Sequence, residues 1–299
     1  MNYFLHFLRI IKSIIKKPIK SLLWFWQDLK KDFEASKIKS ENKFVWCPGL
    51  PKSGTTLLEQ ILERLPYVRL ESSFLRIFDN KNLDHGHGIS TRMFSKIPKQ
   101  KFTFLKTHTH YTNEYERIAL NKKAKIIVSL RDLRDMLISR YYHILFDKNH
   151  WLHNKIKKLN FSSGFILSLK EKSSPELESA LIYYYKWIKD WLVIAKQKDY
   201  LVLWYEDYKL DPIKYINRVI LYTNNKNYSA IKIENEIKYA RLKKKDLSNS
   251  IYSYGRSKST FRKGLVGEWK LLFNNEINDY LNKNLPGPID EVSYKQNIK

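Results

Sequence analysis

Short apolar runs alternate with longer amphipathic stretches along this 299-residue chain from Phe44 onward. The apolar runs predict four buried strands, and the stretches between them repeat apolar side chains every three or four residues, which predicts helices. The predicted strands span 44–47, 102–105, 125–130 and 200–205, and the predicted helices span 57–63, 133–146 and 176–197. Strands that alternate with helices pair in parallel. We therefore expect an α/β fold with a P-loop-like central parallel sheet flanked by helices on both faces.

Two regions depart from this alternation. Residues 71–100 and 147–174 show no clear period and are expected to form lids or loops that line a binding site. The sequence predicts a basic amphipathic helical segment over residues 1–36 and a separate α/β domain over 37–299. On a helix over 1–36, the apolar residues and the basic residues gather on different sides. The apolar residues are Phe4, Phe7, Leu8, Ile11, Ile15 and Leu22, and the basic residues are Arg9, Lys12, Lys16 and Lys20.

The amphipathic segment carries too many charges to span a membrane, which takes about 20 mostly apolar residues. One interpretation places residues 1–30 in a membrane interface as a peripheral contact. The other packs this helix on the protein's own core or on a second subunit, and the sequence leaves both open, as it leaves the oligomeric state.

The amino-acid composition of the chain indicates which classes of partner and which cellular compartment to expect. The formal net charge of +25 attracts polyanions, anionic lipid and multiply charged nucleotides. The chain resembles no RNA-recognition motif, zinc finger or basic zipper, so nucleic acid is not an expected partner. The single cysteine, Cys47, can form no intrachain disulfide, which favours a reducing compartment. We expect a cytoplasmic protein, at the membrane surface if its first residues bind lipid.

The segment 49–56 lies between a predicted strand and a predicted helix and reads Gly-Leu-Pro-Lys-Ser-Gly-Thr-Thr. A small-residue loop that opens a helix offers unpaired backbone N–H groups to an anion. Nucleoside triphosphatases place a Lys directly after the last Gly of this loop. Here Lys52 precedes Gly54 by two residues, which argues against ATP or GTP as the ligand.

Two further clusters can bind a phosphate. Arg131 ends a predicted strand and Ser139 follows on the next helix, so both can reach an anion above the sheet; alternatively, Arg131 pairs with Asp135 across the turn. Near the C-terminus, Arg262 and Lys263 precede a Gly, an order that suits either a phosphate clamp or a solvated basic turn.

Taken together, these motifs resemble those of the sulfotransferase family that uses 3′-phosphoadenosine 5′-phosphosulfate (PAPS). The resembling segments, in family order over about 45–270, are Pro51–Thr56 (5′-phosphosulfate loop), Leu105–His108 (the K-T-H segment), Leu130–Ser139 (3′-phosphate motif), Tyr205–Asp207 and Phe261–Lys270 (third signature). Glu268 stands where Asp is commoner in the family. The motifs are of the cytosolic type, while 57–62 is also similar to bacterial and tyrosyl-protein branches.

The resemblance implies in-line transfer of a sulfuryl group from PAPS to an acceptor hydroxyl or amine, without a metal. It makes His108 the general base, Lys52 the group that stabilises the leaving phosphate, and Lys106 the group that steadies the sulfuryl oxygens. The implied cofactor-binding residues are Lys52, Ser53, Gly54, Thr55 and Thr56 at the 5′-phosphate, Arg131, Ser139, Arg262, Lys263 and Gly264 at the 3′-phosphate, and Tyr205 at the adenine. The implied product is 3′,5′-ADP.

Two other functions stay open: a P-loop kinase-like phosphotransferase, and an inactive basic protein that binds membranes or polyanions. His110 lies two residues after His108, but no carboxylate or thiol nearby completes a metal site. The sequence does not identify the acceptor. Aromatic and basic residues over 141–158 suit a sugar or a lipid-linked acceptor and equally suit ordinary packing.

Overall fold

The computed structural model describes residues 44–70, 91–95, 102–172, 178–242 and 264–295. Five strands form one sheet in the order β2-β3-β1-β4-β5. They are β1 (Phe44–Pro48), β2 (Val68–Leu70), β3 (Thr103–Thr107), β4 (Lys125–Leu130) and β5 (Leu201–Trp204). β1 pairs in parallel with β3 and β4, and β2 pairs in parallel with β3. This confirms the predicted α/β fold with a parallel sheet.

The chain divides into two compact units, each assembled from three separate stretches. Among the described residues, the first unit comprises those within 44–48, 56–127 and 212–242, and the second those within 49–55, 128–211 and 264–295. Within the described residues, the boundaries fall after β1, after the first residue of the next helix, inside β4 and between residues 211 and 212.

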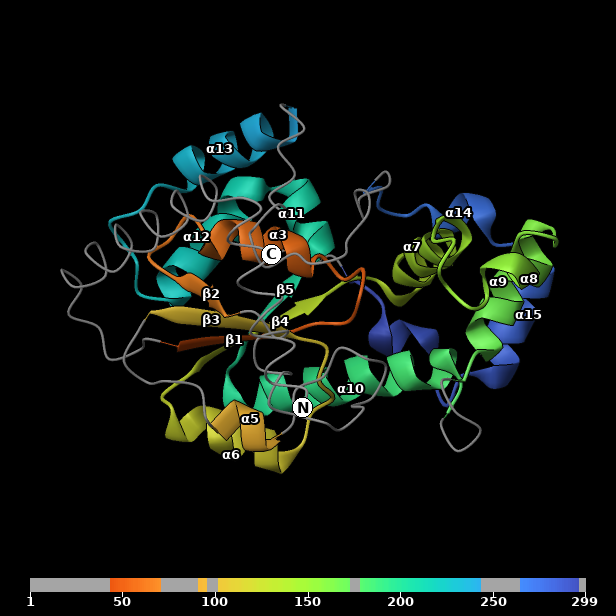
Figure 1. Ribbon diagram of the computed structural model, residues 1–299, viewed down its shortest axis with the longest axis horizontal. Helices are drawn as coiled ribbons and strands as arrows, with labels where there is room; N and C mark the ends of the chain where they lie inside the picture. The colour runs from red at the N-terminus through yellow and green to blue at the C-terminus, as the bar shows by residue number, and fades with distance from the viewer. Residues whose placement is uncertain (1–43, 71–90, 96–101, 173–177, 243–263, 296–299) are drawn as a thin grey trace, which may run out of the picture. The chain divides into compact units, whose positions relative to one another are not determined.

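In the first unit, helices cover both faces of the strands. They are α3 (Thr55–Leu62), α5 (Thr91–Ser95), α6 (Asn113–Asn121), α12 (Pro212–Tyr222) and α13 (Ala230–Leu242). α5 and α6 lie on one face of β1 and β3, and α3 and α12 lie on the other (Figure 1). Buried rings join α5 to β1: the ring of Phe94 lies 4.9 Å from that of Trp46 and 6.0 Å from that of Phe44, centroid to centroid. Such aromatic packing buries large apolar areas and holds these elements together.

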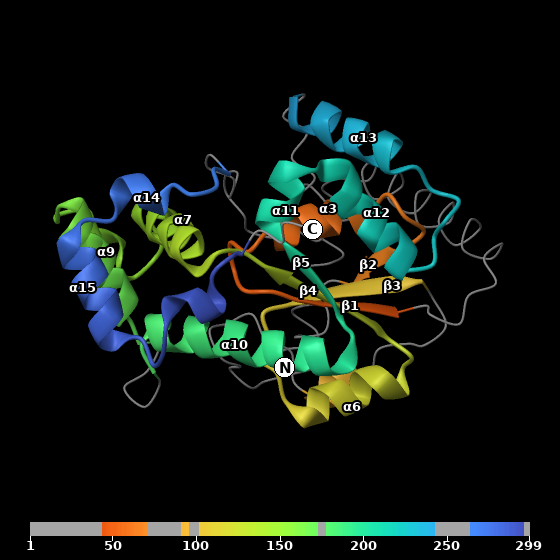
Figure 2. The same ribbon diagram turned by 180° about the vertical axis from the view of Figure 1, so that it is seen from behind.

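The second unit is mostly helical around the ends of β4 and β5. Its helices are α7 (Leu133–Phe146), α8 (His153–Ile156), α9 (Phe161–Lys170), α10 (Ala180–Lys198), α11 (Tyr205–Leu210), α14 (Trp269–Leu272), α15 (Asn275–Asn284) and the 3₁₀ helix η3 (Ile289–Val292). α9 and α15 lie side by side in both views (Figure 1, Figure 2). Phe165 of α9 is fully buried, and its ring packs on Tyr141 of α7 and Phe273.

Two predictions about helices need correction. The segment 147–174 is not irregular, because α8 and most of α9 lie within it; the Asn160 side chain caps α9 by accepting a hydrogen bond from the Ser163 amide at 2.9 Å. α10 starts at Ala180 rather than at 176, because the Ser179 side chain caps it. No helix within the described residues is long and apolar enough to cross a membrane. The predicted helix of 1–36 and most of the predicted loop 71–100 lie outside the described residues.

Candidate active site

The loop that follows β1 is a tight turn stabilised by its own backbone. The Leu50 carbonyl accepts hydrogen bonds from both the amide and the hydroxyl of Ser53, at 3.2 and 2.7 Å. The Ser129 hydroxyl of β4 donates to the Ser53 carbonyl at 3.0 Å. Ser53 is therefore buried and its side chain is used inside the turn. The amides expected to face an anion begin at Gly54 and continue into the first turn of α3, where intrahelical partners are missing.

Two residues of this turn adopt a left-handed backbone conformation. Lys52 has φ of 74° and Gly54 has φ of 90°. Such a conformation strains any residue except glycine, and strain of this kind concentrates at ligand sites. A Cβ atom at Gly54 would also lie only 3.0 Å from Cδ2 of Tyr205. Glycine is thus required here both by the backbone angle and by the closeness of a tyrosine ring.

Tyr205, at the start of α11, links the turn to two other stretches of the second unit. Its ring centroid lies 5.1 Å from the Arg131 guanidinium carbon. Its hydroxyl donates to the Gly264 carbonyl at 3.3 Å. The structure therefore brings together four of the residues selected from the sequence: Gly54, Arg131, Tyr205 and Gly264.

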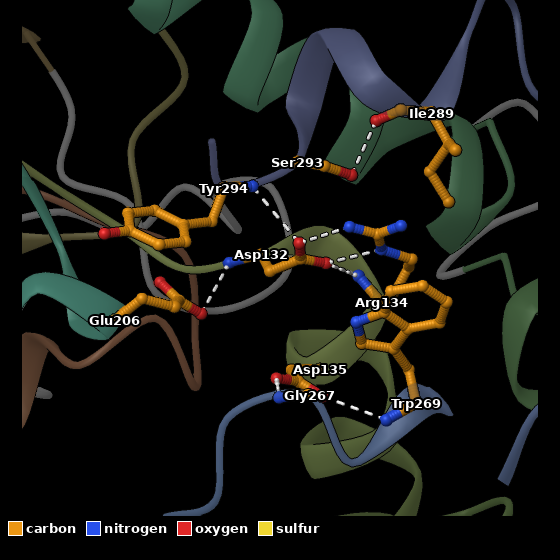
Figure 3. Close-up of polar contacts among 9 residues, drawn as sticks. All are labelled: Asp132, Arg134, Asp135, Glu206, Gly267, Trp269, Ile289, Ser293 and Tyr294. Carbon is orange, nitrogen blue, oxygen red and sulfur yellow. Dashed lines mark hydrogen bonds and ion pairs between the residues drawn. The ribbon is translucent and has the colours of Figure 1, made fainter. Parts of the chain in front are cut away.

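Arg131 is buried at the end of β4 and donates to carbonyl groups from two distant stretches. One terminal nitrogen donates to the Leu265 carbonyl at 2.7 Å, and the other to the Lys52 carbonyl at 3.5 Å. Its Nε is buried and has no hydrogen-bond partner in the part of the chain that the structure describes. Asp135, the alternative partner considered from the sequence, instead accepts backbone amides of Gly267 and Trp269 (Figure 3).

α7 also brings a histidine toward the turn. Part of the His143 side chain is exposed, but loss of water around the ring, followed by the positive charge of Lys52, lowers the pKa of His143 to about 4. Ser139 lies one turn earlier on the same helix and is half-buried. The sensitivity of the His143 pKa to Lys52 could be seen only in the fold.

Lys106 and His108 belong to the first unit. The Lys106 ammonium lies 2.9 Å from the Glu59 carboxylate of α3, and the two side chains are only 10% and 5% exposed. His108 follows β3 directly and is half-buried. The strand before it is fixed at Thr107, which lies opposite Pro48 in the β1–β3 register and accepts the Trp46 indole N–H at 2.9 Å.

Glu59 was missed by sequence reasoning. The sequence does place a carboxylate within the apolar helical stretch 57–62. Because a charge on a buried helix face needs a partner, this position could have indicated a buried ion pair. The same neighbourhood affects Cys47 of β1: burial, and then the Glu59 charge, raises the pKa of its thiol. Cys47 is a free, buried thiol.

Some sequence-selected residues are not tested by this geometry. Arg262 and Lys263 lie outside the described residues, while Gly264 is described and has φ of 60°. Among the described residues, no group of three or more His, Cys, Asp or Glu side chains is arranged to hold a metal ion.

A strand–turn–helix arrangement at the carboxyl end of a parallel strand is a common anion-binding element of α/β proteins. The chain matches the sulfotransferase domain family over residues 42–285. It is 27% identical to rat Sulfotransferase 2A1 over 233 residues, covering 74% of this chain and 75% of that protein. It is 25% identical to the flavonol 3-sulfotransferase of Flaveria bidentis over 292 residues, covering 87% and 89% of the two chains.

Among solved structures, the fold is similar to that of mouse sulfotransferase SULT7A1 complexed with PAP, with a TM-score of 0.59, 19% identity and coverage of 83% and 85% of the two chains. The chain belongs to the sulfotransferase family. The predictions of the family and of a sulfotransferase enzyme are confirmed.

Proposed function

We propose that this protein transfers a sulfuryl group from PAPS to an acceptor hydroxyl or amine and releases 3′,5′-ADP. The observation that carries the proposal is the position of Arg131, whose guanidinium lies between the Lys52 carbonyl and the Leu265 carbonyl. Its buried Nε, without a partner among the described residues, suits an anion. The presence of PAP, which is 3′,5′-ADP, in the mouse sulfotransferase of this fold supports the same ligand.

The 5′-phosphate would be held at the turn after β1. We assign its contacts to the amides of Gly54, Thr55 and Thr56 and to the two threonine hydroxyls, with Ser53 fixing the shape of the turn through Leu50. Lys52 would neutralise the charge that develops on the departing phosphate oxygen.

The 3′-phosphate would be held by side chains from the end of β4, from α7 and from the C-terminal segment. Arg131 and Ser139 supply a guanidinium and a hydroxyl, and Arg262, Lys263 and Gly264 supply further charge and backbone donors. Tyr205, whose ring packs beside Gly54, would border the adenine.

In the reaction, the acceptor oxygen forms a bond to sulfur while the bond from sulfur to the 5′-phosphate oxygen breaks. His108 would take the proton from the acceptor, which requires a neutral imidazole. Lys106 would steady the sulfuryl oxygens, with its ammonium oriented by Glu59. Positioning and electrostatic stabilisation by the protein are the main requirements of such an in-line transfer.

A phosphotransferase is the second candidate function, and the position of Lys52 before Gly54 disfavours it. An inactive polyanion-binding protein is the third. The sugar or lipid-linked acceptor, the cytoplasmic location, the membrane contact through residues 1–30 and the domain boundary at 36/37 stay predictions.

Calorimetric titration without metal tests the proposal. The wild type should bind 3′,5′-ADP more tightly than 5′-AMP or ATP, and Lys52→Ala and Arg131→Ala should each weaken that binding about tenfold or more. Lys232→Ala, an exposed lysine of α13, is the matched control and should bind as the wild type does. Tighter binding of ATP with Mg²⁺, or no binding of 3′,5′-ADP, would overturn the proposal.

A further inference from the structure

Asp135 is a buried carboxylate that the proposed chemistry does not use. It lies in the first turn of α7, four residues after Arg131, and only 1% of it is exposed. Its Oδ2 accepts the Gly267 amide at 2.6 Å and its Oδ1 accepts the Trp269 amide at 3.1 Å (Figure 3). Each oxygen of one carboxylate therefore binds a backbone group of the same C-terminal segment.

This arrangement gives hydrogen bonds to a carboxylate that is shielded from solvent. Burial raises the pKa of Asp135, while the two amides and then the Arg131 charge act in the opposite direction. The start of a helix also favours negative charge. A buried carboxylate kept in this way is costly to leave unbonded, so its two amide partners are held firmly.

Arg134 contacts the same segment through the ring of Trp269. Its guanidinium donates to both oxygens of Asp132, at 2.9 and 2.6 Å, and lies 3.8 Å from the centroid of the Trp269 ring (Figure 3). The Trp269 backbone is thus bound to Asp135 while its ring packs on a cation that Asp132 orients.

The anchored segment continues back to the residues beside Arg131. Leu265 and Gly264 precede Gly267 by only a few residues, and their carbonyls accept from the Arg131 guanidinium at 2.7 Å and from the Tyr205 hydroxyl at 3.3 Å. A shift of the segment at Gly267 would therefore move the carbonyls that border Arg131.

We propose that Asp135 is a positioning residue for the 3′-phosphate: through the amides of Gly267 and Trp269 it fixes the segment 264–269 against Arg131, and so sets the preference for nucleotides that carry a 3′-phosphate. This inference rests on the proposed function. Asp135 itself touches no ligand; it acts through the segment that it holds.

The test compares two ligands that differ only by the 3′-phosphate, namely 3′,5′-ADP and 5′-AMP. In Asp135→Asn, the affinity for 3′,5′-ADP should fall about tenfold, the effect of one charge-assisted hydrogen bond, while that for 5′-AMP changes less than about twofold. Asp147→Asn, at the C-terminal end of α7, makes the same change of charge and should leave both affinities as in the wild type. Asp135→Glu, which keeps the carboxylate, should retain more of the preference than Asp135→Asn.

A second variant changes the backbone of the segment itself, at Gly267. Gly267 has φ of 77°, and among the described residues a Cβ atom there would meet only the Lys270 side chain, at 3.9 Å. Gly267→Ala therefore changes the backbone preference without a clash, and should reduce the preference for 3′,5′-ADP in the same direction. It carries the test if Asp135→Asn fails to give a wild-type circular dichroism spectrum.

The outcomes separate the two proposals. If the wild type does not bind 3′,5′-ADP, the proposed function fails. If the wild type binds it and both variants keep the wild-type ratio of the two affinities, the role of Asp135 fails while the function stands. An equal loss of both affinities, or a lower melting temperature with an unchanged ratio, would mean that Asp135 only stabilises the fold.

Discussion

The buried pair between Glu59 and Lys106 makes a sharp prediction about stability. Glu59→Gln removes one charge of a pair whose atoms lie 2.9 Å apart and whose side chains are 5% and 10% exposed. The substitution keeps the size and shape of the side chain. It leaves the Lys106 ammonium, on the interior strand β3, without the carboxylate that faces it.

The size of the effect follows from burial. Breaking a buried ion pair by removing one partner costs about 3–5 kcal/mol, because the remaining charge stays desolvated, whereas an exposed pair contributes about 0–1 kcal/mol. For a protein of this size, one kcal/mol shifts the melting temperature by roughly 2–4 °C. We expect Glu59→Gln to lower the melting temperature by roughly 6–20 °C.

The assay is thermal unfolding followed by circular dichroism, with a control and a double variant. Glu178→Gln breaks the pair with Lys186, whose side chains are 45% and 49% exposed, and should shift the melting temperature far less. Lys106→Met should destabilise about as much as Glu59→Gln, and the double variant should cost clearly less than the sum. Additive single effects, or a shift for Glu59→Gln no larger than that of the control, would refute the reasoning.

Three further predictions concern the second unit. Burial raises the pKa of Glu206 from 4.5 to about 7, so the folded state keeps a proton that the unfolded chain releases above about pH 4.5. The proton on Glu206 therefore stabilises the folded state at acid pH, and this contribution is lost as the pH rises through 7. In urea unfolding, the free energy of unfolding of Glu206→Gln should fall less between pH 5 and pH 8 than that of the wild type, by roughly 2–3 kcal/mol. An equal fall in the two proteins would contradict this. Gly54→Ala should weaken 3′,5′-ADP binding at least about tenfold in calorimetry, because φ of 90° and the Tyr205 ring both oppose a Cβ atom; undiminished binding would show that the turn tolerates one. In an NMR titration the His143 ring should take up its proton near pH 4. Lys52→Met should raise the pKa of His143, but not as far as 6.5, because burial is the larger cause of the shift. An identical titration midpoint in both proteins would exclude the influence of Lys52.

The fold was predictable where one period dominates a stretch of chain. The observed bounds of β4 and α7 are those predicted, because an apolar run of 125–130 is followed by a capped helix at 133–146. α9 was missed because it packs against α7, α8, α10 and α15, and a helix covered on several sides lacks the polar face that marks its period. β2 has only three residues, too few to show alternation.

The candidate site was predictable only where a motif is local. Lys52, Gly54 and Arg131 could be selected because short segments carry them. The partners of Asp135 and Glu59 could not, because they come from other parts of the chain and no spacing rule relates them: the Gly267 amide is 132 residues from Asp135. Long-range pairing of this kind depends on the fold itself.

Stretches of the two units alternate along the chain, and this has a consequence for the synthesis of the protein. The turn at 49–55 leaves the ribosome well before Tyr205 and the segment 264–269, which border Arg131. At about 5–20 residues per second, the interval between the turn and Leu265 is roughly 10–40 s. During that time the nascent chain carries the turn that we propose binds the 5′-phosphate, but not the segment 264–269. A ribosome stalled before residue 264 should therefore display a chain that cannot yet distinguish 3′,5′-ADP from 5′-AMP.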